Sequence, residues 1–347
     1  MSTASKTVSP LSFARPAERY AIWAALGAFW LLFEFYVWGK WITGPYFVAV
    51  DPGPDPISPA MQTYLFWAQV FLPLLCATCL WFWIVVPWRR EGRLTSDAMI
   101  VIASTTVFFW DFSPSYISDQ VTYNSHLFNR GSWGLHAWPG WVSPGGHLVA
   151  EPLLFVPQAY IVLVLSQVMF VCWVLRKVKA ARPGTGVATF IAVIIASLFA
   201  IDSLVEMAFL RTGLYAYPGA IHAVTLFAGK TYQFPLTEGL LFGGLALGAI
   251  GILKFFKDDR GHTFVEKGIE KLQVSETQKQ LLRLLTIYGW IHSGFFVLYM
   301  LPATLVAVNS DHYPHGYPSY MLNGLCVYGD QRNQCPGPGI SIPRPPR

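Results

Sequence analysis

Residues 187–210 read VATFIAVIIASLFAIDSLVEMAFL, and this stretch decides which kind of fold the chain can adopt. Apart from Asp202 and Glu206, no charged residue interrupts it. A run of ~20 mainly apolar residues is long enough for a helix that crosses the hydrocarbon core of a bilayer. An ionisable group at that depth is costly and marks a functional site by default. The stretch therefore predicts a transmembrane helix whose two acids need a reason to be there.

The composition of the whole chain favours a membrane protein. Of its 347 residues, 54% are hydrophobic and only 12% are charged, which is too little polar surface to cover a soluble globule. We therefore predict an all-α, multi-pass bundle in the cell membrane. The seven expected spans are residues 20–42, 63–88, 98–112, 152–175, 187–210, 236–256 and 284–308. They make a single membrane domain, residues 20–310, between an N-terminal tail, residues 1–19, and a Pro/Gly-rich tail, residues 311–347.

The basic residues predict the orientation of the bundle. Most of the 24 lysines and arginines fall in the N-terminal tail and in the second-to-third, fourth-to-fifth and sixth-to-seventh connections. Because such residues collect on the cytoplasmic side, we expect a cytoplasmic N-terminus and an outer C-terminal tail. The net charge of +5 then belongs to one membrane face and does not indicate a nucleic-acid partner. Residues 257–283 are expected to form an amphipathic helix along that face.

Five acids are expected in the outer half of the membrane. Asp202 and Glu206 are four residues apart and share one helix face. The others are Glu34, Asp111 and Glu238. Lysines and arginines lie only at the rim and His292 near mid-membrane, so nothing basic is expected to neutralise the acids. Neighbouring carboxyls can share a proton and supply an acid and a base, although polar residues in membranes also simply join helices.

Other chemistries lack their residues. The chain has no Gly-rich phosphate loop, no H-E-x-x-H and no membrane-desaturase histidine boxes, so we predict no cofactor and no metal. Gly239, Gly243, Gly244 and Gly248 repeat a small-x-x-x-small spacing that predicts a close helix contact. Cys326 and Cys335 lie in the expected outer tail and are candidates for a disulfide.

Ten short strings carry a resemblance. They are LGAFWLLFEFYVWGKWITGPYF (26–47), VDPGP (50–54), VVPWRR (85–90), YNSHLFN (123–129), GSW (131–133), PGW (139–141), AEPLLF (150–155), YAYPGA (215–220), FPLTEG (234–239) and DDRGH (258–262). In this order they resemble the AveC-like spirocyclases of macrolide and polyketide biosynthesis, of the avermectin and milbemycin type, from about residue 20 to residue 330.

The resemblance implies an enzyme of antibiotic biosynthesis that closes a dihydroxyketone into a spiroketal, with dehydration of the product in at least one branch. Its partners would be a hydrophobic macrolide or polyketide substrate and membrane lipid. The resemblance supplies no catalytic residue.

The residues suggest roles for this chemistry, which needs an acid to expel water and a carboxylate to stabilise the resulting oxocarbenium ion. We expect Glu206 or Asp202 as the acid with its partner as base, and Asp111, Glu34 and Glu238 as further candidates. The expected substrate-binding residues are Trp110, Tyr123, Asn124, His126, Trp133, Glu151, Tyr217 and His222. Taken alone, each aromatic also fits a belt at the headgroup level.

Two rival functions fit the same acids. Another acid-initiated membrane cyclase would act on a polyene epoxide. A lipid-binding or transport-accessory protein would use the acids for packing or proton coupling. The substrate class that is turned over distinguishes the other cyclase from a spirocyclase. A Glu206→Gln variant that folds and keeps its function would favour the lipid-binding or transport-accessory protein.

Overall fold

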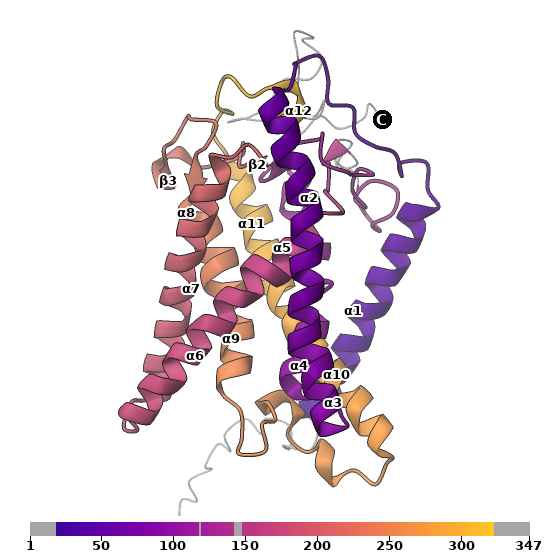
Figure 1. The fold of residues 1–347 in the computed structure, drawn as a ribbon, viewed down its shortest axis with the longest axis vertical. Helices are drawn as coiled ribbons and strands as arrows, with labels where there is room; N and C mark the ends of the chain where they lie inside the picture. The colour runs from indigo at the N-terminus through magenta and orange to yellow at the C-terminus, as the bar shows by residue number, and fades with distance from the viewer. Residues whose placement is uncertain (1–18, 118, 142–147, 323–347) are drawn as a thin grey trace, which may run out of the picture.

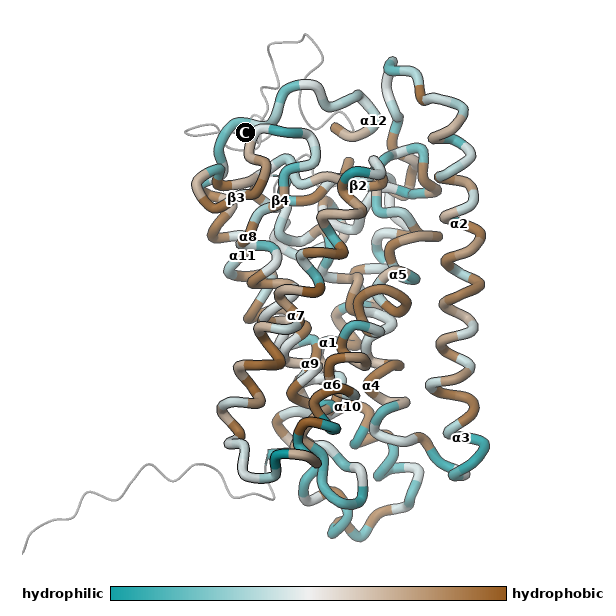
Figure 2. The backbone as a smooth tube through the Cα atoms, turned by 60° about the vertical axis from the view of Figure 1, so that its left-hand side comes forward, coloured by the Kyte–Doolittle hydropathy of each residue, from teal (hydrophilic) through white to brown (hydrophobic). Residues whose placement is uncertain are grey.

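The computed structural model describes residues 19–117, 119–141 and 148–322, which form an upright bundle of helices (Figure 1). Apolar residues dominate the middle of the bundle, and hydrophilic residues gather towards its two ends (Figure 2). This distribution matches the hydrocarbon core and the two interfaces of a bilayer. The prediction of an all-α polytopic bundle is confirmed. The disulfide candidates Cys326 and Cys335 lie outside the described residues.

Within the described residues, six helices are long and apolar enough to cross a membrane, whereas the sequence predicted seven. Four of the six contain a π-helical segment, labelled η1, η5, η7 or η10. The six are α1 (Arg19–Ile42); α2 (Pro59–Leu80) with η1 (Trp81–Val85) and α3 (Val86–Glu91); α5 (Val156–Ala159) with η5 (Tyr160–Leu165) and α6 (Ser166–Ala181); α7 (Val187–Leu210); α8 (Leu236–Glu238) with η7 (Gly239–Ala246) and α9 (Leu247–Phe255); and α10 (Glu276–Phe295) with η10 (Phe296–Met300), α11 (Leu301–Val306) and the 3-10 turn η11 (Ala307–Asn309).

The predicted third span, residues 98–112, is not one helix. Helix α4 (Ser96–Ser104) has only 9 residues and is followed by the 3-10 turns η2 (Val107–Trp110) and η3 (Ser113–Tyr116). Met99, Ile100 and Val101 are completely buried. Irregular backbone is tolerated at membrane depth where protein surrounds it. The predicted third span is therefore a broken, protein-covered segment and is not among the six long helices.

Local chemistry sets the helix ends. Ser58 caps α2 by accepting a hydrogen bond from the Met61 backbone N–H, and Pro59 occupies the first turn. Gly92 ends α3 in the left-handed region, with φ of 67°. Ser275 starts α10 with a capping box. These signals hold the helix termini at the two ends of the bundle.

The tightest helix contact joins α1 to α10 through two glycines. A Cβ atom on Gly27 would overlap the backbone of Leu285, and one on Gly289 would overlap that of Trp23. Trp30 adds a 2.9 Å hydrogen bond from its indole N–H to the hydroxyl of Ser293. Small residues that let backbones approach are a usual packing device in membranes.

Short strands cover one end of the bundle, here called the loop end. Strand β1 (Thr122–Tyr123) pairs with β2 (Tyr215–Ala216), and β3 (Thr225–Leu226) pairs with β4 (Phe234–Pro235), both antiparallel. The turn η6 (His222–Val224) and helix α12 (Ser319–Leu322) also lie at this end (Figure 1). The β1–β2 pair joins the loop after the third crossing to the loop after α7.

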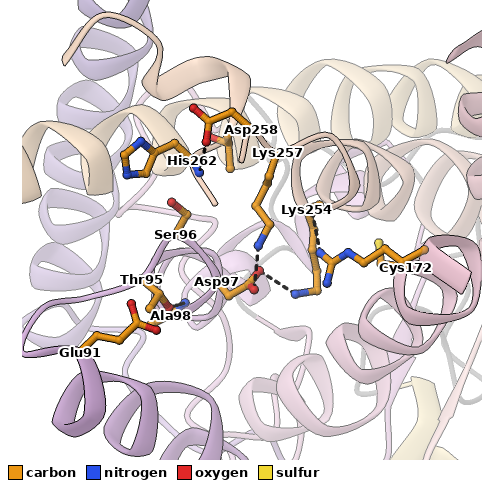
Figure 3. Close-up of polar contacts among 12 residues, drawn as sticks. Glu91, Thr95, Ser96, Asp97, Ala98, Cys172, Lys254, Lys257, Asp258 and His262 are labelled. Carbon is orange, nitrogen blue, oxygen red and sulfur yellow. Dashed lines mark hydrogen bonds and ion pairs between the residues drawn. The ribbon is translucent and has the colours of Figure 1, made fainter. Parts of the chain in front are cut away.

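At the opposite end, here called the basic end, ion pairs join α4 to α9. Asp97 contacts the ammonium groups of Lys254 at 2.7 Å and of Lys257 at 2.8 Å (Figure 3). Burial alone would raise the pKa of Asp97, but the two lysines hold it below its usual value. The pairs fix the start of α4 to the end of α9, which closes the fifth of the six long helices.

The predicted amphipathic helix over residues 257–283 is wrong for its first part. Residues 257–275 contain an isolated bridge between Lys257 and Thr263 and the turns η8 (Phe264–Glu266) and η9 (Ile269–Lys271), and only then does α10 begin. Gly261 and Gly268 adopt positive φ angles of 78° and 106°, which break a helix. The charge pattern alone could not reveal these breaks.

Candidate active site

A cavity of about 70 Å³ lies between α7, η5, η7, η10 and the β1–β2 pair. Four carboxyl groups line it, and no Lys, Arg or His is among the described residues of its wall. The carboxyls are those of Asp111, Asp202, Glu206 and Glu238. Five tyrosines share the wall: Tyr123, Tyr160, Tyr215, Tyr217 and Tyr299. The described wall therefore combines several acids and hydroxyl donors without a basic side chain.

Asp111 is held by hydroxyl donors on both of its oxygens. Tyr123 donates to Oδ2 and Tyr160 donates to Oδ1, each at 2.6 Å. Glu151 lies beside Asp111 and is 1% exposed. Burial, and then the charge of Asp111, raise the pKa of Glu151 well above its usual value. Hydroxyl donors stabilise a carboxylate, so Asp111 is the better placed of the two to carry the charge.

The other three carboxyls come from α7 and α8. Tyr217 donates a short hydrogen bond to Glu206, and Tyr299 lies in hydrogen-bonding contact with Glu238. The Gln167 amide donates to Oδ1 of Asp202 at 3.2 Å, while Oδ2 of Asp202 has no described partner. Asp202, Glu238 and Asp111 are all close enough to Glu206 to interact with it electrostatically. The four acids therefore form one electrostatically interacting group.

Two backbone features bring the walls of the cavity together. The predicted glycine contact is confirmed, because a Cβ atom on Gly243 would lie 2.7 Å from Oδ2 of Asp202. Only a glycine lets η7 approach α7 this closely. In addition, η5, η7 and η10 all contribute wall residues. Such π-helical turns occur often at functional sites because they redirect side chains within a helix.

Glu34 belongs to a separate buried cluster. It lies 2.7 Å from Nδ1 of His292 and accepts a short hydrogen bond from Tyr288. Nε2 of His292 faces the carbonyl oxygen of Ala103 at 3.0 Å, so we place a hydrogen on Nε2. Glu34 therefore differs from the acids of the cavity in having a histidine ring beside its carboxyl group. Glu34 is not in the cavity wall, and its predicted catalytic role remains a prediction.

Trp110 links this cluster to the cavity. Its indole N–H donates to Nδ1 of His292 at 3.1 Å, and the next residue in the chain is Asp111. Trp133 is fully buried and donates to the carbonyl oxygen of Phe109 at 3.0 Å. Both indoles pack in an aromatic cluster outside the cavity wall.

Of the other predicted binding residues, Tyr123 and Tyr217 line the cavity, whereas three polar residues do not. Asn124 donates to the carbonyl oxygen of Gly213 at 3.1 Å and so ties the loop before it to the end of α7. His126 is exposed and packs edge-on against Tyr320. The backbone N–H of His222 donates to Asp311 at 2.7 Å. These three residues lie at the loop end, where they contact other loop residues and do not line the cavity.

Sequence reasoning missed several residues of the wall. Tyr160 and Gln167 are polar residues seven positions apart in an apolar run, a spacing that places them on the same helix face. Tyr299 is likewise a polar group within an apolar span. A search for hydroxyl and amide groups inside the spans, in addition to charges, would have found all three. Among the described residues, no group of three or more His, Cys, Asp or Glu is arranged to hold a metal ion.

Comparison with known proteins gives one match. Residues 88–322 match the family model described as "Spirocyclase AveC-like". No curated protein and no solved structure matches the chain. The matched region covers more than half of the sequence, and it contains Asp111, Asp202, Glu206 and Glu238. The chain therefore belongs to the AveC-like spirocyclase family.

Proposed function

We propose that this protein closes a polyketide dihydroxyketone into a spiroketal by carboxyl acid–base catalysis in the cavity. Membership of a spirocyclase family supports the reaction class. The observation that carries the proposal is the group of four carboxyls in one wall with no described basic residue beside them. Such a group in a site of low dielectric cannot be fully ionised at reasonable cost, so it keeps protons that it can give away.

The reaction requires one acid and one base. One substrate hydroxyl adds to the ketone to give a hemiketal. The acid protonates the hemiketal hydroxyl, water leaves, and an oxocarbenium ion remains. The second hydroxyl attacks this cation and passes its proton to a carboxylate, so the net change is loss of one water. Soluble glycosidases use paired carboxyls for a related cation.

The surroundings of the acids suggest how the roles divide. Glu206 lies among Asp202, Glu238 and Asp111 and is suited to hold the proton that expels water. Asp111, with tyrosine donors at 2.6 Å on both oxygens, suits the carboxylate that stabilises the cation. Asp202 and Glu238 then return the proton to Glu206 between turnovers. Dehydration of the product would need the same acid acting on a neighbouring alcohol.

The test is turnover of a synthetic dihydroxyketone by purified protein in detergent at neutral pH. We compare wild type with Glu206→Gln and Asp111→Asn, and read the product configuration by chiral chromatography. Wild type should give a single configuration. Loss of a general acid should slow the catalysed reaction by on the order of 10²-fold or more. Each variant should therefore yield a slow, mixed product dominated by the uncatalysed reaction.

The matched control is Asp119→Asn. Asp119 is also a buried carboxyl with a tyrosine donor, since Tyr313 donates to it at 2.8 Å, but it does not line the cavity. Its product should keep the wild-type configuration. A mixed product at the background rate from wild type itself would reject the enzyme proposal in favour of a binding protein. Turnover of a polyene epoxide in place of the ketone would favour the other membrane cyclase.

A further inference from the structure

A second, larger hollow adjoins the carboxyl cavity on the side of α2. It is an apolar groove of about 340 Å³ between α2 on one side and η5, α7 and their neighbouring loops on the other. Trp67, Ala68 and Phe71 belong to its α2 wall. Its other wall contains Phe155, Leu163 and Phe209, and these same three residues also line the carboxyl cavity. The groove and the cavity are thus separated by one shared layer of apolar side chains.

The two hollows differ in size and in chemistry. The cavity, at about 70 Å³, can receive a ketone and its two hydroxyls but not the body of a polyketide. Pockets that bind drug-sized ligands usually have ~300–1,000 Å³. The groove reaches that range and its wall is almost entirely apolar. Together they match a substrate with one polar, reacting segment and a long hydrocarbon remainder.

Of the six long helices, the one that begins with α2 is the least buried within the bundle. Of its residues, only Leu65 and Cys76 are buried. Figure 1 shows α2 standing in front of α5 with its whole length in view. Elements with few buried apolar contacts open at low free-energy cost. The groove can therefore widen by movement of α2 without disturbing the carboxyl group.

The route from the loop end is more obstructed. The strands β1 and β2 lie over the cavity, and Tyr123, Tyr215 and Tyr217 in this region are 6%, 9% and 5% exposed. The hydroxyls of Tyr123 and Tyr217 are also bonded to acids of the cavity. Leu163 and Phe209, in the wall shared with the groove, are only partly buried. Opening towards the groove by movement of α2 breaks apolar contacts and the hydrogen bond from the Phe128 backbone N–H to Gln69, whereas opening between the strands breaks hydrogen bonds to acids of the cavity.

We propose that the groove between α2 and the η5–α7 wall binds the hydrocarbon body of the substrate, and that the substrate enters the carboxyl cavity sideways from the bilayer through the layer formed by Phe155, Leu163 and Phe209. This inference rests on the proposed spirocyclase function. The ligand that we propose for the groove is a lipophilic hydroxyketone. It also removes the need for an aqueous path to the acids.

The test fills the groove at a distance from the acids. Ala68→Trp places an indole in the groove, whereas Ala77→Trp places one on the exposed surface of the same helix, outside the groove. Two dihydroxyketones with the same reacting core are compared, one with a long alkyl chain and one truncated. For the long substrate, Ala68→Trp should lower kcat/KM at least about tenfold, a modest loss of apolar binding. The truncated substrate should react equally in both variants.

Each outcome decides a separate point. If wild type cyclises the long substrate and Ala68→Trp equals Ala77→Trp, the groove proposal is overturned while the function stands. If wild type cyclises neither substrate, the function fails, and binding is read instead by photo-crosslinking of a diazirine-bearing long ketone to α2. Crosslinks that map to Trp67 or Phe71 and are lost in Ala68→Trp keep the groove as a ligand site. A diazirine-bearing phospholipid is tested in the same way, with the ketone as competitor. If the phospholipid crosslinks equally well and the ketone does not displace it, the groove holds only lipid and the proposal is overturned.

Discussion

Asp111 and Asp119 each form a hydrogen-bonded pair with a tyrosine, but the two pairs lie in different surroundings. Both carboxyls accept hydrogen bonds from tyrosine hydroxyls, at 2.6 Å from Tyr123 and 2.8 Å from Tyr313. Asp111 belongs to a cavity wall with three further acids. Asp119 instead joins two loops, because its backbone N–H donates to the Tyr313 hydroxyl and its carbonyl oxygen accepts from Gly219. The two aspartates therefore differ in their neighbouring groups more than in the tyrosine bond itself, and only Asp111 has further acids beside it.

The carboxyl of Asp119 should make stability depend on pH. Burial raises its pKa and the hydrogen bond from Tyr313 offsets part of that rise, so that the pKa goes from 3.8 to about 6. A raised pKa means that the folded protein holds the proton more tightly than the unfolded chain. The contribution of Asp119 to folding stability is therefore fully present at pH values below the pKa of the unfolded chain. It is lost as the pH rises through about 6, the pKa in the folded protein. At 1.36 kcal/mol per pKa unit, Asp119 contributes about 3 kcal/mol to the free energy of unfolding at low pH. About 2 kcal/mol of this contribution should be lost between roughly pH 4.5 and 7.5.

The measurement compares wild type with Asp119→Asn by thermal unfolding in detergent at several pH values. Other acids titrate in both proteins, so the difference between their pH profiles isolates Asp119. The asparagine variant should lack this component and should gain relative stability towards neutral pH. Parallel profiles for the two proteins would show that Asp119 does not titrate in this range.

At the residue scale, the acids of the site were predictable and their partners were not. A charge inside an apolar run is conspicuous, which is why Asp202, Glu206 and Glu238 could be singled out from the sequence. A tyrosine in such a run is ordinary, so Tyr160 and Tyr299 gave no comparable signal. The pairing of Glu34 with His292 joins residues far apart in the chain, and single-residue reasoning has no access to such contacts.

At the element scale, the contact between α7 and η7 sets the position of Asp202, and adjacent glycines allow a matched test. A Cβ atom on Gly243 would lie 2.7 Å from Oδ2 and 2.8 Å from Cβ of Asp202. A Cβ atom on Gly244 would meet only ordinary contacts, the nearest at 3.5 Å. Gly243→Ala should therefore push the helices apart, whereas Gly244→Ala should not.

We expect Gly243→Ala to cost ~1–3 kcal/mol of stability, the usual penalty for overpacking. It should also displace Asp202 and reduce spiroketal formation. Gly244→Ala should retain both properties close to wild type. Unfolding in detergent and product configuration are the two readouts. Equal behaviour of the two variants would contradict the close approach of η7 to α7.

Helix positions were predictable from apolar runs, but interruptions within them were not. The span 98–112 has the composition of a membrane helix, yet it breaks after Ser104 because buried surroundings can satisfy a non-helical backbone. The π-helical segments η5, η7 and η10 also leave no mark in hydropathy. These interruptions flank the carboxyl cavity, so the part of the fold that hydropathy could not predict is the part that shapes the site.

At the scale of the whole molecule, the two ends have opposite character. Ion pairs of Asp97 with Lys254 and Lys257 mark the basic end, and the β1–β2 and β3–β4 pairs mark the loop end. The sequence predicts a cytoplasmic basic end from charge alone. With this orientation the carboxyl cavity lies nearer the outer surface, whereas a polyketide is made in the cytoplasm. Under the proposed function, entry from the bilayer along α2 would reconcile the two, because a lipophilic substrate would reach the groove without crossing water.

The orientation is tested with one cysteine at each end. Lys271 is exposed at the basic end and Lys230 is exposed at the loop end, so Lys271→Cys and Lys230→Cys form a matched pair in a background whose five native cysteines are replaced. In intact cells, a membrane-impermeant maleimide should label Lys230→Cys at once and Lys271→Cys only after permeabilisation. The reverse pattern would place the loop end in the cytoplasm, next to the site of polyketide synthesis. The cavity would then face the leaflet in which its substrate first dissolves, and the groove along α2 would need to serve only one leaflet.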